Sequence, residues 1–581
     1  MKKKMIALAT VIVLTFSLVA SPFPTGLSDF TDSQVITAKA ATAGDFEYTE
    51  NTTGVSITKY SGSASSLTIP SSINGKPVVS IDGFRNCVSL TSVVIPATVK
   101  RINSYTFDGC SNLQSISLTE GLSTIKDCAF IGCIGLTNLT IPATVTELDE
   151  DAFINCTSLS NVTVQKNNSN YASVDGILYN KSITRLILYP NAKSGDSYTM
   201  PNTVTSYSNY AFNGNTKLST LTLSNGITVV GDSDFAETSL TTLNFPASVS
   251  SIGAYIFDAP SSCVNINVNV NNKYYRSVDG VLFNKNMTTL ICYPSSKSGT
   301  DYIVPKTVKN FIYSVFEECR YLKEVYLPSG LTYLENATFN NCKNLTTIHF
   351  PSKLTSIGSY VFNGCTSLTN ITIPSSVTSI KDNAFLDCTN LLNITLSNYD
   401  LAIANSAFDN TAWFNAQPDG LIYIGKLAFT YKGSMPVNGK IVFNNQTKKI
   451  NDYLFYNNYR ISDIVIPNGV TNIGEAAFYG CTSLKTVTIP SSVTKIGDFA
   501  LGFCDSETDY DFGSFIPFYR IICTPKSAAE KYAKVNTITY SYTNAKSITT
   551  LSNIKVSSKV VYSTNKNNII PSITIKMVLR H

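Results

Sequence analysis

A phenylalanine recurs every 23 residues along most of this 581-residue chain. A fixed short period indicates a solenoid, because a single unit of that size cannot bury its own apolar face and must stack on its neighbours. The rhythm breaks three times, with steps of 59, 59 and 47 residues. The members are Phe84, Phe107, Phe130, Phe153, Phe212, Phe235, Phe257, Phe316, Phe339, Phe362, Phe385, Phe408, Phe455 and Phe478, with Leu501 in the same register.

Each unit carries one Leu-x-x-Leu-x-Leu pattern, for example Leu90, Val93 and Ile95, and its alternation predicts a half-buried strand. The proline that follows (Pro96) lacks a donor N–H and ends the ladder. One strand plus an irregular return arm predicts a leucine-rich repeat solenoid that is mostly β. A right-handed parallel β-helix has turns of similar length, but it needs several strands per turn, and only one segment alternates cleanly here.

The repeat unit resembles a known family in detail. The pattern C-x-x-L-x-x-[VIL]-x-I-P-x-x-V-x-x-I-x-x-x-x-F-x-x-C is similar to the BspA-type leucine-rich repeat of bacterial surface proteins, over about residues 65–540. The segment from Phe46 to Val78 resembles that family's usual beginning, and the segment from Cys523 resembles its usual end. The resemblance implies a surface-exposed protein that acts in adhesion or host interaction.

The array is expected to end in a short capping helix. Ser527 and Glu530 have the spacing of a capping box, in which the serine accepts from a backbone N–H of the first turn. The alanines and Tyr532 that follow would cover the last coil, as the end of a solenoid requires.

Residues 1–40 are predicted to be a secretory signal peptide rather than part of the fold. Lys2–Lys4 precede the apolar run Met5–Ala20, and Ala38–Ala40 supplies the small residues of a cleavage site. The alternative is an uncleaved anchor, but the apolar run is shorter than the roughly 20 residues that span a bilayer. We therefore expect an exported protein that meets the membrane only during export.

The remaining boundaries follow from changes in pattern. Residues 41–64 are expected to form N-terminal cap strands, residues 65–540 the repeat array, and residues 541–581 an incomplete immunoglobulin-like or disordered tail. The tail offers about three short strands where a sandwich needs about seven, and it lacks a sortase-type Leu-Pro-x-Thr-Gly anchor. We expect a truncated gene product.

The three breaks are expected to hold hairpin insertions near residues 170–200, 274–304 and 412–443. The first two are copies of each other, each with Ser-Val-Asp-Gly followed by an apolar run and Asn-Lys, at Asn180 and Asn284. Two strands around an Asn-Lys turn predict a β-hairpin. Duplication favours a structural elaboration over a ligand loop.

Ten of the fourteen cysteines lie in the repeat register. Stacked coils would place successive register cysteines about 4.8 Å apart, within the range of a disulfide. However, units with Asn215, Thr238 or Thr411 at this position lack the cysteine, which favours a ladder of small buried thiols over disulfides. Zinc is not expected, because no Cys-x-x-Cys pair occurs.

Composition excludes several functions. Charged residues make up 14% of the chain and the net charge is +5, which is too little positive charge to indicate nucleic-acid binding. Only two histidines occur, His349 and His581, and no Ser-His-Asp or Cys-His set can be assembled. The acids of residues 505–511 lack the glycine and final glutamate of an EF-hand, so a solvated loop is expected there. We expect no enzyme activity, no cofactor and no bound metal.

The candidate ligand site comes from the strand positions that point away from the core. Along the array these positions form a neutral carpet of serine, threonine and asparagine. Two consecutive units differ: one carries Glu324 and Tyr326, the next Thr347 and His349. Stacking would place Tyr326 beside His349, an exposed pair with an acid next to it. These four residues could anchor a protein or glycan ligand, or could form a cross-strand pair that only stabilises the sheet.

The function that these observations favour is an exported, surface-associated binding protein, most plausibly an adhesin or host-interaction factor that uses its repeat sheet as a ligand platform. Two alternatives stay open. One is a secreted carbohydrate-active enzyme on a parallel β-helix, and the other is a purely structural envelope protein.

Overall fold

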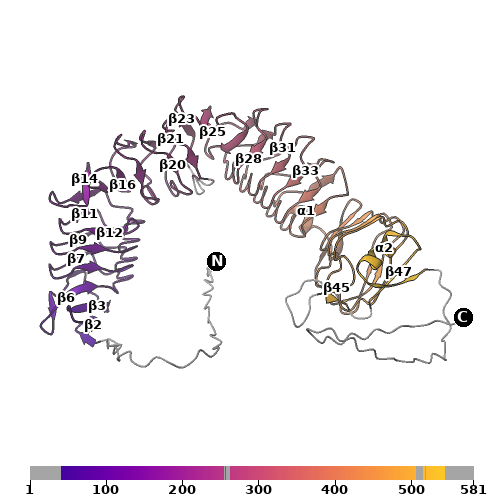
Figure 1. Ribbon diagram of the computed structural model, residues 1–581, viewed down its shortest axis with the longest axis horizontal. Helices are drawn as coiled ribbons and strands as arrows, with labels where there is room; N and C mark the ends of the chain where they lie inside the picture. Colours follow the sequence, from indigo (N-terminus) through magenta and orange to yellow (C-terminus); the bar gives the residue numbers. More distant parts are fainter. Residues whose placement is uncertain (1–40, 254–255, 257–261, 505–513, 517–518, 544–581) are drawn as a thin grey trace, which may run out of the picture.

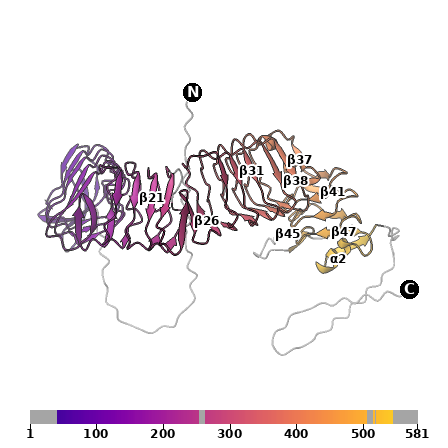
Figure 2. The ribbon, with the colours of Figure 1, turned by 90° about the horizontal axis from the view of Figure 1, so that it is seen from above.

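The computed structural model describes residues 41–253, 256, 262–504, 514–516 and 519–543. Stacked coils of about 23 residues form a long arc (Figure 1). Figure 2 shows the same stack from above, with the last helix at its C-terminal end. This architecture confirms the predicted solenoid. The expected signal peptide, the acidic loop and the expected tail strands lie outside the described residues.

Each coil contributes one strand to the main parallel face, in which a residue pairs with the residue one period later, as Leu139 does with Val162. The strands of this face fall into several hydrogen-bonded sheets, with breaks such as those between β9 and β11 and between β31 and β33. The main-sheet strands are β4 (Ser66–Thr68), β7 (Ser92–Val94), β9 (Ser115–Ser117), β11 (Asn138–Ile141), β13 (Asn161–Val164), β17 (Ser197–Thr199), β19 (Thr220–Thr222), β21 (Thr242–Phe245), β23 (Asn265–Val268), β27 (Asp301–Ile303), β29 (Glu324–Tyr326), β31 (Thr347–His349), β33 (Asn370–Ile373), β35 (Asn393–Leu396), β39 (Gly439–Val442), β41 (Ile461–Val465), β43 (Thr486–Thr488), β47 (Arg520–Cys523) and β48 (Thr539–Tyr542).

The return arm is less irregular than its sequence predicts, because it carries a second parallel ladder of short strands. Most have two residues, such as Arg101–Ile102, in which the isoleucine is buried and the arginine exposed. Two alternating residues are too few to show as a pattern in the sequence. The ladder comprises β6 (Lys76–Ile81), β8 (Arg101–Ile102), β10 (Thr124–Ile125), β12 (Glu147–Leu148), β16 (Arg185–Leu188), β18 (Ser206–Tyr207), β20 (Val229–Val230), β22 (Ser251–Ile252), β26 (Thr289–Cys292), β28 (Asn310–Phe311), β30 (Tyr333–Leu334), β32 (Ser356–Ile357), β34 (Ser379–Ile380), β36 (Ala402–Ile403), β38 (Leu427–Lys432), β40 (Lys449–Ile450), β42 (Asn472–Ile473) and β44 (Lys495–Ile496).

The register phenylalanines stack on one another through the centre of the coils. Phe107 and Phe130 lie with ring centroids 5.4 Å apart and planes 8° from parallel, and Phe130 and Phe153 repeat this geometry. These rings are almost fully buried. Offset stacks of this kind contribute about 0.5–1.5 kcal/mol per pair beyond the area they bury, so the 23-residue period is fixed by the ring ladder as well as by the strands.

The register cysteines are free thiols, as the units that lack this cysteine favoured. Each of seven thiols donates to the backbone carbonyl of the phenylalanine in the preceding coil: Cys365 donates to Phe339 across 3.2 Å. Where threonine replaces cysteine, the hydroxyl donates within its own coil instead, as Thr411 does to the carbonyl of Phe408. The position therefore requires a small buried donor. The seven are Cys110, Cys133, Cys156, Cys342, Cys365, Cys388 and Cys481.

The first two insertions contain the predicted hairpin and one further strand. In the first, β14 (Tyr171–Val174), β15 (Ile177–Asn180) and β16 form an antiparallel meander. The turn between β14 and β15 is Asp175-Gly176, where both residues have positive φ, the conformation that favours Asp-Gly in tight hairpins. The second insertion repeats this with β24 (Tyr275–Val278), β25 (Val281–Asn284) and β26.

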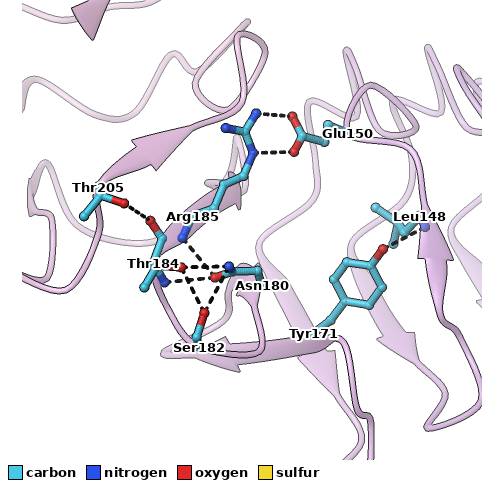
Figure 3. Close-up of polar contacts among 8 residues, drawn as sticks. All are labelled: Leu148, Glu150, Tyr171, Asn180, Ser182, Thr184, Arg185 and Thr205. Atoms are coloured by element: carbon cyan, nitrogen blue, oxygen red, sulfur yellow. Dashed lines mark hydrogen bonds and ion pairs between the residues drawn. The ribbon is translucent and has the colours of Figure 1, made fainter. Parts of the chain in front are cut away.

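The first insertion is tied to the coil that precedes it and the coil that follows it (Figure 3). Arg185 makes a bidentate ion pair with Glu150, with Nη2 2.6 Å from Oε2. The Tyr171 hydroxyl accepts from the backbone N–H of Leu148, and Thr205 donates to the carbonyl of Thr184. These contacts anchor the hairpin as part of the stack, in line with a structural elaboration.

The insertions also explain the 59-residue steps. The ring position 23 residues before Phe212 is taken by Tyr189, which is buried and stacks on Phe212. Tyr293 takes the same buried position before Phe316, with its ring tilted by 40° at a centroid distance of 5.2 Å. Each step is therefore one enlarged coil, closed by tyrosine, followed by one ordinary coil. Counting phenylalanines alone misses these coils, because tyrosine replaces phenylalanine at their ring position.

The third insertion differs in its first arm. A single helical turn, α1 (Ala412–Asn415), replaces the outer strand, and β37 (Gly420–Ile424) then pairs with β38. Lys432 caps the helix by donating to the last two of its carbonyls, those of Phe414 and Asn415, and also to the carbonyl of Gln417 just beyond it. Asn451 joins the coils on either side, because its side chain exchanges hydrogen bonds with the backbone of Ile403.

The ends of the array are covered. At the N-terminal end, β1 (Ala41–Ala43), β2 (Phe46–Glu50) and β3 (Val55–Tyr60) are antiparallel, and β3 then pairs in parallel with β6, beside which β5 (Ser72–Ile73) lies antiparallel. At the other end, the predicted helix is α2 (Ala528–Val535), with Ser527 accepting from the N–H of Glu530. The Tyr532 hydroxyl contacts both backbone groups of Leu501. Close by, β45 (Phe503–Cys504) pairs with β46 (Ser514–Phe515).

The ring ladder gives a first prediction. Phe362 is fully buried between Phe339 and Phe385, at centroid distances of 5.5 and 5.0 Å. Phe362→Ala should lower the free energy of unfolding by about 3–5 kcal/mol, because it removes both stacking contacts and leaves a cavity. The midpoint of urea unfolding measures this. The exposed Thr372→Ala serves as control and should change stability by no more than about 0.5 kcal/mol. Equal midpoints for the two variants would contradict a contribution of the stacked rings to stability.

The thiol ladder gives a second prediction. In the native protein at pH 8, the buried register thiols should react with an aromatic disulfide reagent far more slowly than the half-buried Cys87. After unfolding without reductant, all fourteen should react, because none is paired. A count that falls short by an even number would indicate disulfides instead.

A third prediction concerns alkaline pH. Burial raises the pKa of Cys110 and of Cys156 to about 12, whereas an unfolded thiol titrates near pH 8.5. Above that pH the unfolded chain binds fewer protons than the native chain, so stability that is complete below about pH 8.5 is lost progressively as the pH rises toward 12. Melting temperatures measured from pH 7 to 10 should fall over the upper part of that range, and a flat profile would contradict this origin.

Candidate functional site

The four residues singled out by the sequence lie together on the outward face of β29 and β31. These strands are parallel neighbours in which Glu324 pairs with Thr347 and Tyr326 with His349. Val325, between the two outward residues of β29, is fully buried. The alternation therefore holds the pair on the solvent side while the core fixes the strand from behind.

Tyr326 and His349 form a tight parallel stack. Their ring centroids are 4.1 Å apart and the planes differ by 5°. Tyr326 keeps 38% of its surface exposed, and the His349 side chain keeps 45%. Each ring therefore covers one face of the other, while the rest of both side chains stays exposed to solvent.

Glu324 links the two rings. Its Oε1 accepts from His349 Nε2 at 2.6 Å and from the Tyr326 hydroxyl at 2.9 Å. The hydrogen bond from His349, followed by that from Tyr326, lowers the pKa of the Glu324 carboxyl below its ordinary value. The same carboxylate raises the pKa of the Tyr326 hydroxyl. The three side chains are therefore held in one geometry, with the carboxylate ionised and the phenol neutral at physiological pH.

The structure adds two residues that sequence reasoning missed. On β27, Asp301 pairs with Glu324 and Ile303 with Tyr326, one strand before the predicted pair. Ile303 is 71% exposed, so an apolar side chain extends the aromatic row. Subtracting one period from Glu324 and Tyr326 locates both residues. The unit is harder to recognise because Ser296 and Gly299 stand where the repeat has its cysteine and first leucine, although Pro305 and Val308 follow in register. Asp301, Ile303, Glu324, Tyr326, Thr347 and His349 are together called the β27–β31 strip.

The strip continues into the neutral carpet that the sequence predicts. Asn370 and Thr372 on β33, and Asn393 and Thr395 on β35, are exposed in the same rows. The amides form a ladder of their own, since Asn393 Nδ2 donates to Asn370 Oδ1 across 2.6 Å. The charged and aromatic groups of the strip therefore stand beside a rigid, uncharged surface.

The described part of the chain shows no cluster of three or more histidine, cysteine, aspartate or glutamate side chains arranged to hold a metal ion. Within the same residues, no helix has the length and apolar character needed to cross a membrane.

The repeat geometry agrees with a comparison against known families. A model of the BspA type leucine-rich repeat region matches residues 79–194, 188–298, 291–415, 415–521 and 448–578, which together span most of the chain. The chain belongs to the BspA-type leucine-rich repeat family. The strip thus lies within the BspA-type repeats themselves, on coils of ordinary length.

Solved structures that resemble this BspA-type chain include three from bacteria. A leucine-rich cell surface protein of Faecalibacterium prausnitzii is 28% identical, with 64% of this chain and 92% of that chain covered and a TM-score of 0.43. A leucine-rich repeat protein of Eubacterium ventriosum is 22% identical over 63% and 97% of the two chains, with a TM-score of 0.38. The pneumococcal vaccine antigen PcpA is 17% identical over 87% and 98%, with a TM-score of 0.27. A search of the curated proteins finds no match.

Proposed function

We propose that this BspA-type protein is an exported, surface-associated binding protein, an adhesin or host-interaction factor, and that the β27–β31 strip is its ligand-binding site. The observation that carries the proposal is the exposed stack of Tyr326 on His349, held by Glu324. Exposed aromatic groups on a rigid surface are the residues that binding partners use as anchors.

The strip is preorganised for binding. Both rings belong to paired strands, and Glu324 fixes their orientation by two hydrogen bonds. A partner therefore gains contact area without having to order the side chains first, which is the usual cost of recruiting long or flexible groups. The exposed Ile303 next to Tyr326 supplies apolar surface for the centre of a contact.

Export and surface association are supported by the predicted signal peptide and by family membership. A non-enzymatic role is supported by the composition of the strip. His349 is the sole histidine among the described residues, and its Nε2 is engaged by Glu324. The proposed partner is a protein or glycan on a surface, and no nucleic acid partner is proposed.

The strip gives a fourth prediction. Tyr326→Ala and His349→Ala should each weaken capture of the mature chain on immobilised extracellular-matrix proteins or glycans by about fivefold or more, the loss expected for an interface anchor. Melting temperatures should stay close to that of the parent chain, because both side chains are exposed.

Thr372→Ala on β33 is the matched control, since it changes an exposed side chain one strand beyond the pair. If the double variant Tyr326→Ala/His349→Ala captures ligand as well as the parent chain, or if it unfolds at a much lower temperature, the pair serves the sheet alone. Incubating the mature chain with polysaccharides tests the non-enzymatic role, and cleavage with turnover would contradict it.

A further inference from the structure

A second surface feature lies at the third insertion, far along the array from the strip. The chain there forms a hollow of about 460 Å³ where the coil of Phe408 meets the coil of Phe455. Three segments line it: the turn before Phe408, the end of β38, and the turn around Phe455. The residues used in the argument are Asn405, Thr430, Tyr431, Tyr453, Tyr456 and Asn458, which together are called the tyrosine hollow.

Comparison with the first two insertions explains why the coils leave a space here. Tyr189 and Tyr293 close the enlarged coils of those insertions, are buried, and contact a second tyrosine on the next main-sheet strand, with Tyr189 4.8 Å from Tyr198. Tyr431 occupies the equivalent position of the third insertion. It follows Ala428, which pairs with the next ladder strand, by three residues, as Tyr189 follows Leu186.

Tyr431 lacks that cover. The main-sheet residue that corresponds to Tyr198 is Ile441. Tyr198 pairs with Leu221, nine residues after Phe212, and Ile441 pairs with Ile464, nine residues after Phe455. Tyr431 is only half-buried, and it lies tilted against Phe455 at 6.1 Å and 52° instead of stacking. An aromatic ring that is interior in two insertions is thus a wall of the hollow in the third.

Two further tyrosines form the rim. Tyr453 and Tyr456 are 44% and 39% exposed, and their rings lie 5.7 Å apart. Tyr456 is backed by Tyr479, on which it stacks at 5.1 Å with planes 8° apart. Tyr453 is fixed by a hydrogen bond to Glu475, which raises its pKa to about 12, so its hydroxyl stays neutral. The rings are held as rigid, uncharged platforms.

The polar lining points to a ligand. Asn405 Nδ2 donates to the backbone carbonyl of Tyr453 across 3.0 Å. Asn405 Oδ1 is shielded from solvent, yet it accepts no hydrogen bond from any residue that the structure describes. A buried amide oxygen without a donor is costly. Thr430 and Asn458 add further neutral polar groups.

The chemistry of the lining selects one class of ligand. None of the described residues that line the hollow is charged. Flat aromatic faces require a ligand with an apolar face, and amide and hydroxyl groups require one that also carries neutral hydrogen-bonding groups. A sugar ring has both properties, because its C–H face is apolar and its hydroxyl groups both donate and accept.

We propose that the tyrosine hollow is a binding site for a neutral carbohydrate. One sugar unit stacks on the exposed ring of Tyr456 or Tyr453, and hydroxyl groups of the same chain hydrogen-bond to the neutral polar residues of the lining. This inference does not rest on the function proposed for the β27–β31 strip, since the two sites share no residue.

The test titrates the mature chain with a panel of neutral oligosaccharides built from glucose, galactose, mannose and N-acetylglucosamine. Isothermal calorimetry measures affinity, and saturation-transfer nuclear magnetic resonance identifies the sugar protons near aromatic rings. At least one member should bind, with saturation on the C–H face of a ring. Tyr456→Ala and Tyr453→Ala should each weaken binding about tenfold or more, and Tyr456→Phe should retain most of it because the stacking face remains.

Tyr360→Ala is the matched control. Tyr360 occupies the same register as Tyr453, two residues before a register phenylalanine, with the same positive φ and nearly the same exposure, but it lies outside the hollow. It should bind as the parent chain does. Failure of every oligosaccharide to bind, undiminished binding by Tyr453→Ala and Tyr456→Ala, or an equal loss in Tyr360→Ala would each overturn the proposal.

Discussion

The stacking of one coil on the next at a constant step is the constraint from which the other features follow. Two parallel ladders and a column of phenylalanine rings each require the same residue to recur after 23 positions. A single coil has no core of its own, so these contacts between coils supply nearly all of the stability. Each register position is therefore chosen for what it offers the neighbouring coil, as the thiols show by donating to the carbonyl of the preceding phenylalanine.

Constraint on the core leaves the outward face free to vary. Serine, threonine and asparagine occupy most outward positions because they are compatible with a strand and satisfy one another, as Asn370 and Asn393 do. A departure from this carpet costs the fold little, which makes the β27–β31 strip informative. An exposed isoleucine, a tyrosine, a histidine and two acids on three consecutive strands depart from this pattern, and the function that we propose assigns them to ligand binding.

The insertions show how a solenoid can gain a concave feature. In the first two, a second tyrosine covers the closing tyrosine and the stack stays continuous. In the third, a helical turn replaces one strand and an isoleucine replaces the covering tyrosine, so the ring of Tyr431 stays half-buried and lines the hollow. The strip and the tyrosine hollow are thus different solutions: one is built on a flat sheet with charge, and the other lies between coils without charge.

The sequence by itself determined the solenoid, the main strands, the small buried position of the register cysteines, the capping helix and the four residues of the predicted site. The first three are local patterns repeated many times, so that each copy confirms the others, whereas the helix follows from one capping box and the four residues from a departure from the repeat. The tertiary structure alone decided the second ladder, because two-residue strands leave no periodic trace, and the closing role of Tyr189 and Tyr293, because tyrosine conceals the phenylalanine period. It also decided that Ile303 joins Tyr326 and that Asn405 lies beside Tyr453, residues 48 positions apart. Such neighbours depend on how an insertion shifts one coil against the next, and that shift is set by packing that no single segment contains.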